Sequence, residues 1–415
     1  MSAPAPRIQI EAEPESVGMS STRLGRIDTH FQRYIDDGRL AGWQVVVARR
    51  GQVVHHSTAG HRNVAAGLPV DADTIWRIYS MTKPVTAVLA LQLWEEGAFE
   101  LNDPVAKYIP SFAHTKVWRG GSTTSPVLDP QVEPMRLWQL FAHTSGLTYG
   151  FMYHHPVDEL YRRAGFEWGL PKGCDLAGVC DALAGLPLLF QPGAEWNYSM
   201  GLDVLGRVLE VVSGQPLDEL MRDRLLAPLG MNDTTWYAPE AQQGRLASLY
   251  GAHPATGAAV PLDVAGAAAL HPPQALLGGG GLLSTAYDYQ RFVQMLANEG
   301  ELDGARILSP RTVRYMASNH LPGGADLTSF GRPLFSETTF DGVGFGLGVS
   351  VSIDPVAARV PGNPGEFAWG GAASTAFWVD PADELTVTFF TQLLPSSTHP
   401  IRSQLKQLVY QAMLD

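Results

Sequence analysis

Residues 75–94 contain a serine and a lysine at a spacing that suits nucleophilic chemistry. Ser80 and Lys83 are three positions apart, so on a helix they share a face and the hydroxyl can reach the amine. Pro84 is tolerated only in or beside a first helical turn, so we expect the helix to begin near Ser80. The positive end of that helix would favour an oxyanion formed beside Ser80. The pair predicts a serine nucleophile with Lys83 as its proton acceptor.

The scarcity of lysine favours this interpretation. Lys83 is one of only five lysines among 29 basic residues, and a buried lysine can lose its proton whereas an arginine essentially never does. The Ser-x-x-Lys pattern is short, however, and it occurs again at Ser403 and Lys406. That copy falls within a predicted C-terminal helix, on a face that we expect to be solvated, and we interpret it as a chance match.

A third proton carrier is predicted at Tyr198. This tyrosine lies in a turn-rich segment, PGAEWNYSM, directly before a helical pattern. A phenol held near ammonium groups could ionise and carry a proton between nucleophile and leaving group. A packed core tyrosine is the alternative interpretation of the same residue.

Two glycines at the start of a predicted strand indicate a place of close approach. Gly370 and Gly371 follow Trp369, and the missing side chains would let a backbone or a substrate come near. We expect the main-chain N–H groups of Ala372 and Ser80 to form an oxyanion hole, with Trp369 lining the acyl pocket. A core or interface position is the alternative for Trp369.

The elements that must position these residues fall into three blocks along the 415 residues, a length that suggests two to three domains or one domain interrupted by another. A helical pattern at 21–37 is followed by strand patterns at 43–50 and 53–60, which Gly51 and Gln52 join as a hairpin. Residues 115–270 show helical stretches and few strands. Strand patterns return at 345–353, 375–381 and 385–392, before a last helix from 401.

Strands at both ends of the chain and helices in its middle predict an α+β fold. A lone hairpin is barely stable, so we expect one antiparallel five-stranded sheet flanked by N- and C-terminal helices. The sheet domain would be discontinuous, formed by 1–114 and 271–415. A mostly helical domain of 115–270 would be inserted into it, with the active site in the cleft between the two.

Composition and motif searches exclude several other classes. A net charge of −12 argues against nucleic acid and anionic membranes as partners. The N-terminus lacks an apolar leader, which predicts a cytoplasmic location. Neither Gly-x-Ser-x-Gly nor His-Glu-x-x-His occurs, so we expect no nucleophile elbow, metal or cofactor. Cys174 and Cys180 fit no zinc or redox spacing; free thiols are expected, and a disulfide is compatible.

Two further features are interpreted as structural, and one property stays open. We expect His143 to hold a loop of the helical domain, and the glycine tract 278–281 to form a turn near the site. The sequence does not indicate the oligomeric state.

The motifs, taken in order, resemble the serine β-lactamase and penicillin-binding-protein superfamily, and most closely the family VIII carboxylesterases and class C β-lactamases. Ser80-x-x-Lys83 is similar to the nucleophile motif, Tyr198-Ser199-Met200 to the Tyr-x-Asn element, and Trp369-Gly370-Gly371 to the Lys-Thr-Gly element. HTSGL at 143–147 and PLGMNDT at 228–234 also resemble family landmarks, and the likeness runs from about residue 20 to the end. The resemblance implies a β-lactamase/transpeptidase-like fold.

Two departures from the lactamase pattern bear on the substrate. Met200 and Trp369 stand where such lactamases keep Asn and Lys. A β-lactam would therefore lose partners for its amide and its carboxylate, and an unpaired buried carboxylate is costly. The resemblance thus implies a carboxylesterase that cleaves small esters through an acyl-enzyme on Ser80, with Met200, Trp369, Gly370 and Gly371 contacting the substrate.

Alternatives within and outside this chemistry stay open. A β-lactamase, D-peptidase or acyltransferase would use the same residues. A non-catalytic penicillin-recognising homologue is the third alternative, although such a scaffold would not need Ser80, Lys83 and Tyr198 together. The natural ester, its acyl-chain length and its stereochemistry are not indicated by the sequence.

Overall fold

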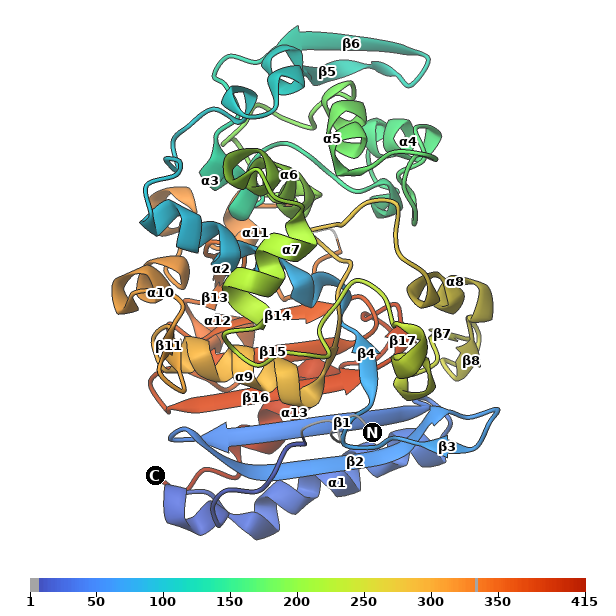
Figure 1. The fold of residues 1–415 in the computed structure, drawn as a ribbon, viewed down its shortest axis with the longest axis vertical. Helices are drawn as coiled ribbons and strands as arrows, with labels where there is room; N and C mark the ends of the chain where they lie inside the picture. Colours follow the sequence, from blue (N-terminus) through green and yellow to red (C-terminus); the bar gives the residue numbers. More distant parts are fainter. Residues whose placement is uncertain (1–6, 333–334) are drawn as a thin grey trace.

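The computed structural model describes residues 7–332 and 335–415, so residues 1–6 and 333–334 of the predicted sheet domain lie outside it. Figure 1 shows strands from the two ends of the chain, blue and red, side by side in one sheet. Helices of the middle of the chain lie above this sheet. The α+β class predicted from the sequence is confirmed. The domain limits at 114/115 and 270/271 stay a prediction.

The main sheet has eight antiparallel strands, not the predicted five. Their spatial order is β12 (Val343–Phe345), β13 (Ser350–Ser352), β14 (Phe367–Gly371), β15 (Thr375–Asp380), β16 (Leu385–Thr391), β1 (Gly42–Arg49), β2 (Gln52–Asn63) and β3 (Leu68–Pro69). The difference comes from β3 and β14, which were not predicted as strands, and from the run 345–353, which was predicted as one strand and forms parts of two. The run 345–353, predicted as one strand, is part of the β12–β13 hairpin, because Gly348 adopts a φ of 89° and turns the chain.

The predicted β1–β2 hairpin forms, but its two-residue loop is Arg50 and Gly51, one residue earlier than the predicted Gly51 and Gln52. Arg50 and Gly51 both have positive φ values, 51° and 75°, as the tight turns of two-residue hairpin loops require. Every residue of β1 is buried, since both faces of the sheet are covered. Val45 and Val47 pack in the same hydrophobic cluster as α1 (Ser21–Asp36) and α13 (Ile401–Tyr410), whereas Val46 belongs to the cluster on the opposite face.

The opposite face of the sheet carries α2 (Thr82–Glu95) and α9 (Ala286–Ala297), and α2 leads upward to the helical part of the molecule (Figure 1). The remaining helices are α3 (Leu137–Phe141), α4 (Pro156–Arg163), α5 (Leu176–Ala184), α6 (Gly201–Ser213), α7 (Leu217–Met221), α8 (Asp263–Ala267), α10 (Pro310–Met316), α11 (Leu327–Phe330) and α12 (Pro355–Ala358). No helix within the described ranges is long and apolar enough to cross a bilayer.

Short secondary sheets supplement the helices. They are β4 (Ile75–Arg77) with β9 (Leu283–Thr285), β5 (Lys116–Ser122) with β6 (Ser125–Pro130), β10 (Glu301–Leu302) with β11 (Ala305–Arg306), and β7 (Tyr250–Ala252) between β8 (Ala259–Pro261) and β17 (Leu393–Leu394). The middle of the chain therefore holds two hairpins beside its helices, which the scarcity of strand patterns there did not indicate.

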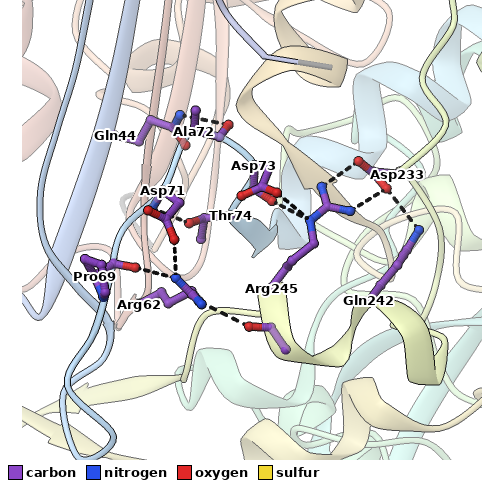
Figure 2. Close-up of polar contacts among 11 residues, drawn as sticks. Gln44, Arg62, Pro69, Asp71, Ala72, Asp73, Thr74, Asp233, Gln242 and Arg245 are labelled. Carbon is purple, nitrogen blue, oxygen red and sulfur yellow. Dashed lines mark hydrogen bonds and ion pairs between the residues drawn. The ribbon is translucent and has the colours of Figure 1, made fainter. Parts of the chain in front are cut away.

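Ionic contacts anchor the segment that enters β4, the strand that precedes Ser80. Figure 2 shows Arg245 bonded to both carboxylate oxygens of Asp233, at 2.9 and 2.6 Å, and to Asp73. Asp71 lies on the same segment as Asp73, and its carboxylate accepts a hydrogen bond from Arg62 of β2 at 2.5 Å. The approach to β4 is thus tied on two sides, by the β2 strand and by the 233–245 segment.

Candidate active site

Ser80 lies in one 3-10 turn, Tyr79–Met81, directly before α2. The α-helix therefore begins two residues later than expected, but the serine still lies at its N-terminal end. Tyr79 enters the turn with a φ of 43°, a left-handed conformation that is unusual for a bulky residue and is found where the surroundings impose it. The turn leaves Ser80 only 9% exposed.

The structure brings the three predicted proton-handling residues together. Tyr198 OH donates to Ser80 Oγ at 2.5 Å, and Lys83 Nζ lies 3.2 Å from the same oxygen. Tyr198 arrives from the loop before α6, 118 residues away from Ser80 in the chain. Lys83 Nζ also donates to the carbonyl oxygen of Gly279 at 2.5 Å. One hydroxyl oxygen is thus contacted by an amine and a phenol.

Burial prepares Lys83 for a role as a base. Its side chain is 1% exposed, and this burial lowers the pKa of Lys83 to about 8, against the opposing charges of Asp203 and Glu337. A lysine with that pKa is neutral in about one molecule in ten at pH 7. The neutral amine can keep its hydrogen bond to Gly279 and direct its lone pair at the Ser80 hydroxyl.

The surroundings of Tyr198 set the protonation of its phenol in the resting site. Burial, together with the negative charge of Glu337, raises the pKa of Tyr198 well above its ordinary value. The phenol therefore stays protonated in the resting site and donates to Ser80. The geometry suits Tyr198 as a proton donor and Lys83 as the acceptor.

Asp203 and Gly279 join the site without having been predicted as site residues. Asp203 is buried in the first turn of α6, where its Oδ1 accepts from the N–H of Gly279 at 2.8 Å. A side chain at Gly279 would collide with that carboxylate, and one at Gly278 with the carbonyl oxygen of Leu202. The glycine tract does form a turn near the site, as predicted. The sequence did hold a signal for Asp203, because it is an acidic residue on the otherwise apolar face of the helical pattern GLDVLGRVL.

The glycine pair lies at the end of β14, not at the start of a strand as predicted, and it explains how the strand approaches Ser80. A Cβ on Gly371 would collide with the carbonyl oxygen of Ile78, two residues before Ser80, and one on Gly370 with the guanidinium of Arg402. Gly371 therefore allows strand and turn to meet, whereas Gly370 makes room for a side chain on the α13 face. Throughout the described ranges, the N–H groups of Ser80 and Ala372 donate to no protein acceptor, as an oxyanion hole requires.

Aromatic and apolar side chains surround the phenol of Tyr198. The Trp369 ring lies 5.4 Å from that of Tyr198 and 5.2 Å from that of Phe345, edge to face in both pairs. Met200 is buried at the N-terminus of α6. His143 binds Ser199 Oγ through Nδ1 at 3.0 Å, and burial lowers the pKa of His143 well below its ordinary value. This neutral, enclosed imidazole fits the loop-holding role predicted for it.

The second Ser-x-x-Lys copy has no comparable geometry. Lys406 forms an ion pair with the buried Glu366, and Ser403 Oγ donates to the carbonyl oxygen of Pro400 at 3.1 Å. The face that carries Lys406 is half-buried, so the expectation of a solvated face is wrong, because Glu366 draws the lysine inward. Cys174 and Cys180 are both free thiols.

Fold and site together place the chain among known proteins. The model of the Beta-lactamase family matches residues 27–411, and the chain belongs to this family. It is 30% identical to Esterase EstB of Burkholderia gladioli over 96% of this chain and 98% of that protein. It is 31% identical to Lovastatin esterase of Penicillium rubens over 86% and 90% of the two chains. These relatives support a serine hydrolase of the beta-lactamase superfamily.

A solved structure agrees with this placement. EstCE1, described as a hydrolase with promiscuous acyltransferase activity, superposes with a TM-score of 0.79 at 27% identity, over 94% of this chain and 99% of that one. The β-lactamase/transpeptidase-like fold implied by the motifs is confirmed.

Proposed function

We propose that this protein is a carboxylesterase that cleaves small carboxylic esters through an acyl-enzyme on Ser80. The single observation that supports this most is the convergence of Lys83 Nζ and Tyr198 OH on Ser80 Oγ. We also propose a cytoplasmic location, which the two free thiols support.

Acylation begins when the neutral amine of Lys83 accepts the proton of the Ser80 hydroxyl. The oxygen then attacks the ester carbonyl, and the resulting oxyanion is bound by the N–H groups of Ser80 and Ala372, each such donor contributing roughly 10²–10³ in rate. As the tetrahedral intermediate collapses, the alcohol leaves with the proton of Tyr198, and the Tyr198 oxygen regains a proton from Lys83. The acyl group remains on Ser80.

Deacylation repeats these steps with water as nucleophile. Lys83 accepts a proton from the water, which attacks the acyl carbonyl, and Ser80 leaves with a proton returned through Tyr198. The carboxylic acid departs and the starting protonation states are restored. If an alcohol replaces water, the same site performs acyl transfer, and the printed description of EstCE1 makes this the second candidate activity.

The apolar surroundings favour an uncharged ester over a β-lactam. Trp369 and Met200 are buried beside Tyr198 and offer no cation for a carboxylate. A carboxylate brought there without a partner would lose its hydration uncompensated. We therefore expect nitrocefin to be a much poorer substrate than p-nitrophenyl butyrate.

The test is a panel of p-nitrophenyl esters from acetate to laurate, with nitrocefin beside it. We expect turnover of the short esters and a fall to background in Ser80→Ala, while Ser403→Ala, which alters the other Ser-x-x-Lys serine, keeps wild-type rates. A fluorophosphonate probe should label Ser80, as peptide mass spectrometry would show. Activity retained by Ser80→Ala, or nitrocefin turnover as fast as that of the esters, would refute the proposal.

A further inference from the structure

The guanidinium of Arg402 lies against the turn that carries Ala372. Arg402 belongs to the first turn of α13, and a side chain at Gly370 would collide with its Nη2. The same Nη2 donates to the carbonyl oxygens of Gly371 at 3.1 Å and Thr375 at 3.0 Å. Gly371 and Thr375 are paired with each other across β14 and β15, so Arg402 joins both ends of the turn between these strands.

One of the two carbonyl groups belongs to the peptide unit that supplies an N–H of the oxyanion hole. The carbonyl of Gly371 and the N–H of Ala372 are parts of one planar peptide, and this peptide is trans. In a trans peptide the C=O and the N–H point in opposite directions. Because the carbonyl oxygen accepts from Arg402, and from the N–H of Ser374 at 2.9 Å, the N–H of Ala372 is directed away from both donors. Arg402 therefore restricts the direction of this N–H.

The charge of Arg402 also affects how strongly the Ala372 N–H donates. A hydrogen bond from an ionised donor is stronger than one between neutral groups, and successive hydrogen bonds polarise one another. A guanidinium at the carbonyl oxygen of Gly371 draws electron density from the peptide and leaves a more positive hydrogen on its N–H. Since an arginine keeps its proton throughout the pH range in which enzymes work, this polarisation does not vary with pH.

Glu337 holds the guanidinium in this place. Its carboxylate lies 2.5 Å from Nη2 of Arg402, and Nη1 donates to the main-chain carbonyl oxygen of Glu337 at 2.8 Å. Ser396 Oγ donates to the same carboxylate oxygen at 2.9 Å. The Glu337 side chain is only 1% exposed, and a buried carboxylate without a partner is costly. The ion pair therefore keeps Arg402 beside the turn.

We propose that Arg402 is a positioning residue for the oxyanion hole: it orients and polarises the Gly371–Ala372 peptide, and Glu337 fixes it for this role. This inference rests on the proposed esterase function and adds a residue that acts on the transition state through the backbone. A purely structural Arg402 would affect every reaction of the site alike. A positioning Arg402 affects a reaction in proportion to how much that reaction depends on the oxyanion hole.

The test uses two substrates that differ only in the atom that the oxyanion hole binds. p-Nitrophenyl butyrate places an oxygen there, whereas p-nitrophenyl thionobutyrate places a sulfur, which is a weak hydrogen-bond acceptor. The measured quantity is the ratio of kcat/KM for the oxygen ester to kcat/KM for the thionoester. Glu337 also influences the pKa of Lys83, but a change in the base cancels in this ratio because both esters use it.

We expect the ratio to be about 10² or more in wild type and about tenfold lower in Arg402→Gln. Removing an oxyanion donor altogether costs roughly 10²–10³ in rate, and here the N–H is only misdirected and less polarised. The matched control is Arg49→Gln. Arg49 is also buried, donates to the carbonyl oxygens of Val17 and Gly18 and pairs with Asp415, so its loss should leave the ratio unchanged.

The outcomes separate this inference from the proposed function. No turnover of p-nitrophenyl butyrate by wild type would refute the esterase proposal itself. Equal losses for the two esters in Arg402→Gln, or a wild-type ratio near one, would overturn the role of Arg402 alone. If thermal unfolding shows that Arg402→Gln does not fold, Glu337→Gln decides, because it keeps the guanidinium and removes its ionic partner. A lowered ratio in that variant supports the inference, and an unchanged ratio overturns it.

Discussion

The substitution Asp203→Asn tests how the site sets the protonation of Lys83. The carboxylate of Asp203 accepts a hydrogen bond from the N–H of Gly279, and the amine of Lys83 donates one to the carbonyl oxygen of Gly279. The backbone of Gly279 therefore separates the carboxylate from the ammonium group. Their distance is then roughly 7 Å, given the length of one backbone unit. At an effective dielectric constant of about 20, their attraction is about 2 kcal/mol, which corresponds to one to two pKa units, roughly, on Lys83.

The sign of the expected change follows from the cause. Burial lowers the pKa of Lys83 to about 8, and the negative charge of Asp203 opposes that shift. Removing the charge should lower the pKa of Lys83 further, to about 6 to 7. Because the base must be neutral to act, the free amine at pH 7 would rise from about a tenth of the molecules to half or more. We therefore expect activity at pH 7 to increase about fivefold.

The assay is kcat/KM for p-nitrophenyl butyrate against pH, with Ser80→Ala as the blank for spontaneous hydrolysis. In wild type the rate should rise through about pH 8, and in Asp203→Asn through a pH one to two units lower, roughly. Asp288→Asn removes another buried carboxylate, one that bonds Asp233 and Thr234 instead of Gly279, and should leave the inflection in place. An inflection that stays or rises in Asp203→Asn would refute the reasoning.

Two further predictions concern charge in buried positions. Lys83→Arg should reduce ester hydrolysis to the Ser80→Ala level at every pH up to 10, because a guanidinium does not release its proton. The control Lys406→Arg should keep full activity. Measurable turnover by Lys83→Arg would contradict the role of Lys83 as the base. Burial raises the pKa of Asp288 to about 7, above its ordinary unfolded value, so ionising it should cost the folded state stability as pH rises from about 4 to 7, by up to roughly 4 kcal/mol. In Asp288→Asn, the free energy of unfolding measured in urea should therefore depend less on pH between about 4 and 7. An unchanged pH dependence would contradict a raised pKa of Asp288.

The predicted site residues are those whose relationship is local or whose order along the chain is distinctive. Ser80 and Lys83 are one helical turn apart, so spacing alone indicates that hydroxyl and amine meet. The β1–β2 hairpin was likewise predicted from a glycine between two strand patterns, although its turn lies at Arg50 and Gly51, one residue earlier than predicted. Tyr198 and Trp369 depended on the order of motifs and on the resemblance they carry.

Other features had no local signal. The strands β3, β12 and β13 are two or three residues long, too short for alternation to show. The strand β14 ends in two glycines, which are depleted in strands, so the sheet was predicted with five strands. The contact between Lys83 and Gly279 joins positions 196 residues apart.

The sequence by itself determined which groups could react: a hydroxyl, an amine and a phenol, on an α+β fold. Only the tertiary structure decided their protonation. Burial among elements distant in the chain lowers the pKa of Lys83 against the charges of Asp203 and Glu337, whereas burial and the same two charges raise the pKa of Tyr198. Spacing along a helix is a short-range property of the backbone, whereas desolvation depends on everything that packs around a group.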